Sequence, residues 1–494
     1  MTLADSRSGQ LEATRPDAEG AVLNRCRMAA ELVQRGQYED AREALGDLWR
    51  GAGRRPEVGG LSAATAAAVL LQVGALSGWL GATRQEGGAQ EAAKDLISES
   101  ATLYERAGDS AGAALARSDL ALCYWREGAF DEARVLLGRA HAELAGADAE
   151  RRVVVLLRSV TVECADGKLH DALEILKASA RLLDACENHA LRGNFHSLYA
   201  VLLHRLGALE GKSEHFDRAI IEHTAAIFNY EQARHERYRA YNENNLASLL
   251  RRMGLYGQAH EHLDRAAAVF SRLDDTGLLA QADETRARVF IGEGKHAEAA
   301  RAAGRSVRTL EKGGVSAILA DALTTQGVAL ARLGETEKSL EVLRRAVRVA
   351  EEAGALVNAG RAALTLVEEH AAGRVPEPAE LYDFYRRADE LLCATQDSDD
   401  VARLRACARV VMRKMAGPQP GESGFMMFDA VRELEERCIE KALEASGGSV
   451  TQAARLLGVH HQSFIAMLNT RHKKLLPRRS PAERRLRSII KPSK

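Results

Sequence analysis

The sequence predicts an all-α protein: a solenoid of stacked helical hairpins followed by a small C-terminal helical domain. Three observations lead to this fold class. The 494 residues contain only 9 Pro and 5% aromatic residues, whereas the helix-favouring Ala, Leu, Glu and Arg are abundant. A pattern of Gly, a large residue and a small residue recurs along most of the chain, at steps near 40 residues. Residues 471–494 are strongly basic, whereas the rest of the chain is acidic.

The N-terminal part of the sequence contains two features that bear on location. Residues 1–20 have no apolar stretch, so we expect a disordered N-terminus without a secretory signal. Residues 61–82 contain no charge over 22 positions, which is long enough to cross a bilayer. They are mostly Ala, however, and we favour a buried helix of the solenoid over a membrane span.

The cysteines also bear on location. The seven are scattered and form no Cys-x-x-Cys pair, which indicates neither a disulfide framework nor a zinc site. We therefore expect a cytoplasmic protein without a metal or other cofactor.

The repeat unit consists of a Gly, a large residue two positions later and a small residue three positions after that. The steps between the small residues are 40, 39, 47, 40, 40 and 40, at positions 93, 133, 172, 219, 259, 299 and 339. Gly can adopt the left-handed conformation that ends a helix, and the small residue lets the second helix of a hairpin cross the first closely. One hairpin cannot bury both of its faces, so the hairpins must stack over residues 21–415.

These residues resemble the tetratricopeptide repeat (TPR) family, through Leu80-Gly81 and the spacing of Ala133 and Ala140 among others. The step exceeds the family's period of about 34 residues, which implies longer helices. The 47-residue step contains an insertion at residues 209–214, where we expect a longer loop. The resemblance implies a groove that is lined by the first helix of each hairpin and binds a protein or peptide partner.

The groove implied by this resemblance contains polar residues from three successive hairpins. The expected lining residues are Tyr241, Asn244, Asn245, Ser248, Arg252, Gln281, Glu284, Arg288, Thr324 and Thr325. Asn244 and Asn245 are unfavourable neighbours inside a helix. Two interpretations stay open: they are solvated surface, or their amides bind the backbone of a peptide or partner strand.

A change of composition separates the solenoid from the C-terminal domain. Residues 416–424 contain two Pro and three Gly, which predicts a linker over residues 416–427. An amphipathic helix follows and ends at Gly447-Gly448. Its apolar face is wider than one short domain needs, so we expect a homodimer that forms through Val431, Leu434, Cys438 and Ala442.

Two further helices follow with the spacing of a helix-turn-helix, so we expect a domain over residues 428–475. Ser449 and Gln452 form a capping box, Gly458 makes the turn, and a second helix begins near His461. The core between these helices is expected to contain Ala453, Ala454, Leu457, Val459, Phe464 and Met467 or Leu468.

Residues 434–474 resemble the Fis-type helix-turn-helix. The matching residues are Leu434, Glu435, Ile439, Ala442, Leu443, Gly448, Ala453, Ala454, Arg455, Leu457 and Gly458. The resemblance implies sequence-specific binding of double-stranded DNA by a dimer, with the helix from His461 in the major groove. The expected DNA contacts are His460, His461, Gln462, Ser463, Ile465, Ala466, Asn469, Arg471, Lys473, Lys474, Arg478 and Arg479.

The second helix departs from the family because it is uncharged until Arg471. Phosphate contacts must then come from the residues that follow, including a basic tail over residues 476–494. Residues 471–494 contain ten Lys and Arg against one Glu, a balance of +9, so the chain's net charge of −1 leaves −10 on residues 1–470.

Enzyme motifs are incomplete in this sequence. The segment 207–213 has three residues between its glycines, where a phosphate-binding loop needs four. The His260-Glu-His262 and His460-His461 pairs lack the i, i+4 spacing of a zinc site. We therefore predict a non-enzymatic transcriptional regulator whose solenoid senses a partner. Two alternatives stay open: a TPR scaffold or adaptor whose C-terminal domain only dimerises, and a nucleoid-type protein that binds DNA with little sequence preference.

Overall fold

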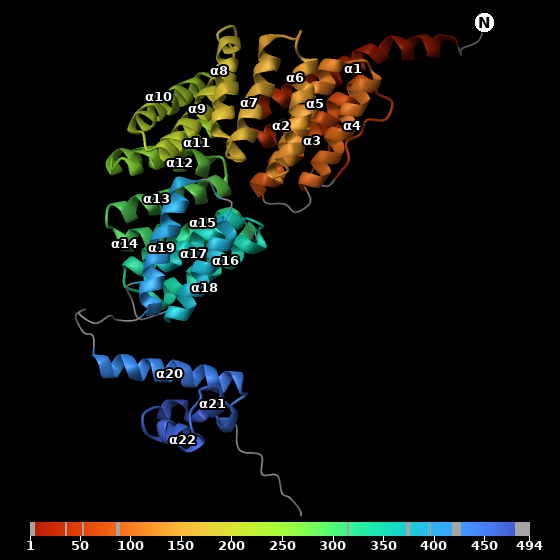
Figure 1. Ribbon diagram of the computed structural model, residues 1–494. Helices are drawn as coiled ribbons and strands as arrows, with labels where there is room; N and C mark the ends of the chain where they lie inside the picture. Colours follow the sequence, from red (N-terminus) through yellow and green to blue (C-terminus); the bar gives the residue numbers. More distant parts are fainter. Residues whose placement is uncertain are drawn as a thin grey trace, which may run out of the picture. The chain divides into compact units, whose positions relative to one another are not determined.

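The structure is a computed structural model. It describes residues 5–34, 37–51, 54–84, 89–313, 316–371, 376–393, 395, 397–416 and 426–479. Over these residues the chain forms 22 α-helices and three short 3-10 helices, and no strand (Figure 1). The predicted all-α fold is confirmed. Two compact units divide the chain, residues 1–407 and 408–494.

Helices of the first unit follow one another as hairpins. The first four hairpins and a shorter segment within them are α1 (Asp5–Gln34), α2 (Tyr38–Leu45), η1 (Gly46–Leu48), α3 (Ala63–Arg84), α4 (Ala89–Arg106), α5 (Ser110–Arg126), α6 (Phe130–Glu143), α7 (Ala149–Ala165) and α8 (Leu169–Leu183). The next are α9 (His189–Glu210), α10 (Ser213–Gln232), α11 (Glu236–Arg252), α12 (Tyr256–Arg272), α13 (Thr276–Gly292), α14 (His296–Leu310) and η2 (Glu311–Gly313). The last are α15 (Ala317–Arg332), α16 (Thr336–Glu352), α17 (Leu356–His370), α18 (Pro378–Leu392) and α19 (Ser398–Ala416).

The hairpins stack as a helical-repeat solenoid. Each first helix of α1 to α18 packs against its own second helix, and most also contact the first helix of the next hairpin, as in α11 with α13 and α13 with α15. The predicted small residues lie at the helix crossings, and all seven are fully buried, at 0% exposure: Ala93, Ala133, Ala172, Ala219, Ala259, Ala299 and Ser339. The turns before them contain glycines with φ near +80°, such as Gly128 and Gly334. The TPR-like prediction is confirmed.

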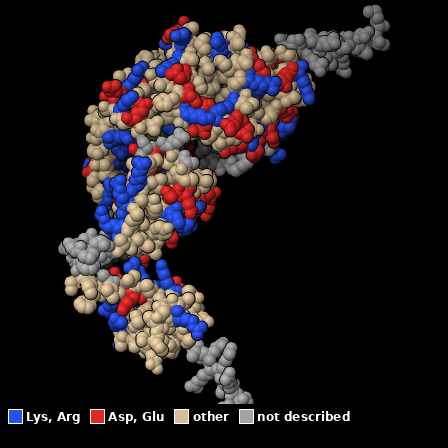
Figure 2. Space-filling model, viewed as in Figure 1, with Lys and Arg blue, Asp and Glu red and all other residues tan. Residues whose placement is uncertain are grey.

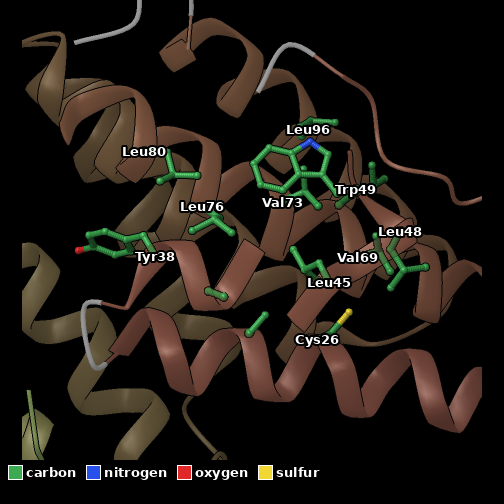
Figure 3. Close-up of a cluster of buried hydrophobic side chains, with 13 residues drawn as sticks. Cys26, Tyr38, Leu45, Leu48, Trp49, Val69, Val73, Leu76, Leu80 and Leu96 are labelled. Atoms are coloured by element: carbon green, nitrogen blue, oxygen red, sulfur yellow. The ribbon is translucent and has the colours of Figure 1, made fainter. Parts of the chain in front are cut away.

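Helix α3 contains the long uncharged stretch. Among the described residues it is the one helix long and apolar enough to cross a membrane, and 61% of that window, residues 63–81, is buried inside the unit. Val69, Val73 and Leu76 point into a cluster that includes Trp49 (Figure 3). The expected buried helix of the solenoid is confirmed.

Two expectations about the first unit differ from the structure. A longer loop was expected at residues 209–214, but α9 continues to Glu210 and α10 begins at Ser213. The insertion therefore lengthens both helices, and Gly211, with φ +67°, makes the turn. Disorder was expected over residues 1–20, but α1 begins at Asp5, and residues 1–4 lie outside the described residues. Extending a helix that is already packed costs less than starting one, which accounts for this difference.

The solenoid also closes on itself. The ring of Tyr38 stacks on Trp79 of α3 at 5.7 Å between centroids, and Trp79 meets the edge of Tyr238 of α11 at 6.5 Å. The guanidinium of Arg237 lies 5.5 Å from the centre of the Tyr38 ring. Helix α3 also contacts α13. We term these four residues the closure cluster, because they join helices about 200 residues apart in the sequence.

The second unit contains the C-terminal helices α20 (Met427–Ala445), α21 (Val450–Leu456), α22 (His461–Thr470) and η3 (Lys473–Arg478). The boundary between the units falls inside α19, before the predicted linker at residues 416–427. Residues 417–425 of that linker and residues 480–494 of the predicted basic tail lie outside the described residues.

Close packing between first and second helices gives a test of the solenoid. A Cβ added at Gly327 of α15 would lie 2.5 Å from Cγ of the buried Leu343 of α16. We expect Gly327→Ala to lower the free energy of unfolding by about 1–3 kcal/mol through overpacking. The control Gly138→Ala, whose Cβ would meet nothing within 4 Å, should raise it by roughly 0.5–1 kcal/mol. Urea unfolding followed by circular dichroism measures both, and equal behaviour would contradict the close crossing.

Candidate nucleic-acid interface and groove

The C-terminal unit has the core that the sequence predicts for a helix-turn-helix. Ala453 and Ala454 of α21 are buried where it crosses α20, and Phe464 and Leu468 of α22 are fully buried against them. Leu457, Val459 and Met467 pack at the edge of this core. The hydroxyl of Ser449 accepts a hydrogen bond from the backbone N–H of Gln452, and Gly458 turns the chain with φ +64°.

Residues after α22 complete this core, which the sequence analysis missed. Leu475 of η3 is buried against α20 and α22, and Leu476 packs beside it. His472 is also buried, and its Nε2 lies 3.1 Å from the carboxylate of Glu435 on α20. The sequence does contain an indication that this segment packs against the core. Leu475 and Leu476 interrupt a basic run, and two adjacent leucines are not expected in a solvated tail.

Helix α22 presents an uncharged, hydrogen-bonding face to solvent. His461, Gln462, Ser463, Ala466 and Asn469 are exposed and Ile465 is half-buried. His460, the residue that precedes the helix, is exposed as well. The surface over α22 is largely uncharged (Figure 2). The predicted base-facing residues therefore share one accessible face, because Phe464 and Leu468 turn the opposite face inward.

Three of the cations expected to contact DNA instead pair with acids of α20. Arg471 lies 3.1 Å from Glu435, Lys474 pairs with Glu436, and Arg478 lies 2.5 Å from Glu440 and 3.2 Å from Glu444. Surface pairs of this kind contribute little to stability, about 0–1 kcal/mol each. They nevertheless neutralise charge that the sequence analysis assigned to phosphate contacts. In the part of the chain that is described, Lys473 and Arg479 have no acidic partner.

The face of α20 that we expected to form a dimer is only partly available. Val431, Leu434 and Cys438 are exposed. Ala442 is buried in the domain core beside Ala453 and Ala454, so including it in the dimer face was wrong, because α21 crosses α20 at that position. Phe428 extends the exposed apolar face in the other direction and is 81% exposed.

The predicted groove residues lie on neighbouring helices of the solenoid. We term the polar stripe along α11, α13 and α15 the groove face. Tyr241, Asn245, Ser248 and Gln281 are half-buried there, and Asn244 is 8% exposed. Its burial excludes the interpretation of Asn244 as plain solvated surface. The side-chain Oδ1 of Asn244 is buried without a hydrogen-bond partner.

Ion pairs and hydroxyls connect the helices of the groove face. Glu284 pairs with Arg288 on α13 and accepts a hydrogen bond of 2.5 Å from the hydroxyl of Thr325 on α15. Thr324 donates within its own helix, to the carbonyl of Ala320. Arg252 lies 3.7 Å from Asp399 of α19. The residues expected in the groove are thus brought together, although several already satisfy one another.

A buried pair beneath the groove face escaped the sequence analysis. His223 of α10 and Asn242 of α11 are both fully buried, with 3.1 Å between Nδ1 and Oδ1. Burial lowers the pKa of His223 to about 4, so this imidazole is neutral at pH 7 and donates from Nδ1 to the Asn242 oxygen. This hydrogen bond joins α11 to α10 on the side away from Asn244, which lies two positions further along α11.

Leu475 provides the test of how the C-terminal domain is completed. We expect Leu475→Ala to cost about 2–5 kcal/mol, because it leaves a cavity between η3, α20 and α22. The matched control is Leu456→Ala on α21, where the side chain is 62% exposed and the expected change is within about 0.5 kcal/mol. Hydrogen exchange over residues 426–479 measures both, and equal protection in the two variants would show that η3 is not part of the fold.

Comparison with protein families matches residues 430–464 to one family, described as "Bacterial regulatory protein, Fis family". A comparison with curated proteins finds no match. The matched segment covers most of α20, all of α21 and the start of α22. It ends before His472 and Leu475, so the segment that completes the core lies beyond the family match.

Solved structures similar to the chain are helical-repeat proteins. Aspartyl phosphate phosphatase F from Bacillus subtilis is 14% identical, with a TM-score of 0.45 over 82% of this chain and 97% of that chain. The apo quorum sensor NprR from B. thuringiensis is 14% identical, with a TM-score of 0.40 over 69% and 98%. A Rap protein complexed with competence and sporulation factor is 14% identical, with a TM-score of 0.48 over 75% and 100%. At these identities the likeness concerns helical architecture alone. The C-terminal unit therefore contains a Fis-type helix-turn-helix of bacterial regulatory proteins.

Proposed function

We propose that the protein is a transcriptional regulator that acts in the cytoplasm. In this proposal α22 binds specific double-stranded DNA, and the groove face of the solenoid binds a protein or peptide partner. The observation that supports it most is the exposed hydrogen-bonding face of α22, on a domain that matches the Fis family. Gln462 and Asn469 have amides, which both donate and accept and therefore suit the paired N6 and N7 groups of adenine.

The geometry of α22 fits insertion into the major groove by its N-terminal end. His461, Gln462 and Ser463 form the exposed first turn, which is the part of a recognition helix that contacts base edges. Lys473 and Arg479, which have no acidic partner among the described residues, are available for phosphate contacts close to this helix. We propose that these two cations position the domain and that the amides of α22 determine the sequence.

A second candidate function is a scaffold or adaptor whose C-terminal domain only pairs two chains. The observation that favours it is the pairing of Arg471, Lys474 and Arg478 with acids of α20, which removes cations from DNA contact. The exposed apolar face of α20 fits the same role. DNA binding by the full chain separates the two candidates.

A second copy of the chain is the proposed partner of the α20 face. Met427, Val431, Leu434 and Cys438 are exposed and follow one another at steps of 4, 3 and 4 residues. This is the spacing with which two helices pack along one seam. We therefore propose a homodimer that forms through this half of α20.

The main test of the proposed function separates the phosphate contacts of Lys473 and Arg479 from the base contacts of α22. A preferred site is first selected from random duplexes with the full chain. Lys473→Gln with Arg479→Gln should weaken binding to all sequences and reduce the log–log salt slope by roughly one unit per lost phosphate contact. Gln462→Ala should leave that slope unchanged and cost about 1–3 kcal/mol on the preferred site only. Fluorescence anisotropy at several salt concentrations measures both, with Lys441→Gln on α20 as the matched charge control.

Two results would count against this assignment. If Gln462→Ala weakens binding to random and preferred duplexes equally, α22 does not determine the sequence. If the unaltered chain binds no duplex at low salt, the scaffold function is correct instead.

The dimer is tested by Leu434→Asp, which places a charge in the centre of the apolar face. We expect the unaltered chain to be dimeric on the order of tens of micromolar and the variant to be monomeric. Leu456→Asp on α21 introduces the same change at another exposed leucine and should leave the dimer intact. Sedimentation equilibrium measures the mass, and a monomeric unaltered chain would contradict the proposed dimer.

A further inference from the structure

We infer that the outer face of α19 is a second DNA-binding surface, which contacts the phosphates of the duplex that flanks the site bound by α22. Its cations are Arg405, Arg409 and Arg413, which we term the arginine row. The inference rests on the proposed DNA-binding function and assigns part of that function to the last helix of the solenoid.

The arginine row lies on one exposed face of α19. Its three residues are exposed and follow one another at steps of four, so they extend over about 12 Å of the helix axis. Cys407 and Val411 lie on the opposite face and are buried. On that inner side, Sγ of Cys407 lies 3.9 Å from the carbonyl oxygen of Leu364 on α17. The arginine row therefore points away from α17, and Lys and Arg side chains gather over this part of the solenoid (Figure 2).

No acidic residue neutralises the arginine row. Residues 401–416 contain five Lys and Arg and no Asp or Glu. Arg403, on the inner side of the helix, pairs with Glu368 of α17, whereas no carboxylate of the described residues lies within salt-bridge distance of the arginine row. Like charges four residues apart on a helix repel one another and destabilise it. An unfavourable row that makes no internal ion pair indicates an anionic partner outside the chain.

Unpaired arginines elsewhere in the solenoid, such as Arg181 and Arg308, are isolated. Arg181 has an acidic residue, Asp184, one turn away on the chain. Arg308 lies one turn from Arg305, which pairs with Asp283. A single cation of this kind is ordinary solvated surface. The arginine row differs because its three successive cations give the extended positive potential that attracts a polyanion.

Duplex DNA matches the arginine row in charge and in length. DNA carries one negative charge per about 1.7 Å of its axis, so a row about 12 Å long faces several phosphates. In the C-terminal domain α22 is uncharged, and Arg471, Lys474 and Arg478 already pair with acids of α20. Phosphate contacts from another part of the chain would therefore strengthen binding.

The linker is long enough for α19 and α22 to reach one duplex. Ten residues separate Ala416, the end of α19, from Met427, the start of α20. A segment of ten residues extends to at most about 35 Å, which is about one turn of duplex DNA. DNA that flanks the site of α22 is thus within reach of the arginine row.

Binding of the full chain to duplexes of two lengths tests the inference. One duplex is the preferred site trimmed to its recognised base pairs, and the other adds about 20 base pairs on each side, roughly two helical turns. We expect the long duplex to bind more tightly by about tenfold or more. Arg405→Gln with Arg409→Gln and Arg413→Gln should remove most of this advantage and reduce the log–log salt slope on the long duplex by roughly one unit per lost phosphate contact. Binding to the trimmed duplex should not change. Fluorescence anisotropy at several salt concentrations measures these effects.

The matched control is Arg301→Gln with Arg305→Gln and Arg308→Gln on α14. These arginines are also exposed and closely spaced, but two of them pair, with Glu298 and Asp283. The control removes the same formal charge and should keep the advantage of the long duplex. Circular dichroism on heating should show the α19 variant at least as stable as the unaltered chain, because repulsion within the arginine row is removed.

The outcomes separate the arginine row from the proposed function. If the α19 variant keeps the advantage of the long duplex, or the α14 control loses it equally, binding by α22 stands and only the inference fails. A marked loss of stability in the α19 variant would assign the arginine row to the fold and overturn the inference. If the unaltered chain binds no duplex at low salt, the DNA-binding function fails together with it.

An acidic protein is the other class of partner that the arginine row could bind. Fluorescein-labelled hexaglutamate is the probe for it. If this peptide binds to the unaltered chain and not to the α19 variant, while the two duplexes bind with equal affinity, the arginine row contacts acidic protein and the inference is overturned.

Discussion

The solenoid depends on the close crossing of two helices at one small residue in each hairpin. At these positions only the small side chain of Ala or Ser lies between the backbones, and all seven are inaccessible to solvent. Glycines such as Gly327 extend the crossing by leaving room for a large side chain of the facing helix, here Leu343. Because every hairpin stacks on the next, the distance set at each crossing also sets the spacing of the first helices. The position of Asn244 on the groove face therefore follows from the packing behind it.

Local patterns explain why most of the solenoid was predictable from the sequence. The small residues recur at nearly equal steps, and a period of this kind specifies hairpins without any knowledge of distant contacts. The closure cluster was not predictable, because Trp79 and Tyr238 have no pattern that relates them and meet only after the hairpins have stacked. The insertion at residues 209–214 was misjudged for a related reason: Leu209 and Glu210 are good helix formers, and the turn is confined to Gly211 and Lys212.

The C-terminal domain was predicted in outline, whereas its charge distribution was not. The spacing from Ser449 to Gly458 determined the two helices and the outward face of α22. The pairing of Arg471, Lys474 and Arg478 with α20 depends on how η3 packs, which no local pattern specifies. A signal was nevertheless present, since Glu436, Glu440 and Glu444 recur every four residues and so form an acidic row along α20.

The closure cluster has a consequence for how such a chain can change over evolutionary time. An open solenoid can gain or lose whole repeats by duplication or deletion of its gene segment, because each repeat contacts only its neighbours. Here Tyr38 stacks on Trp79, and Trp79 contacts Tyr238. One extra hairpin between α3 and α11 would displace Tyr238 relative to Trp79 and break this contact. These ring contacts therefore oppose the gain or loss of a hairpin in that interval, whereas substitution of side chains on the groove face leaves them intact.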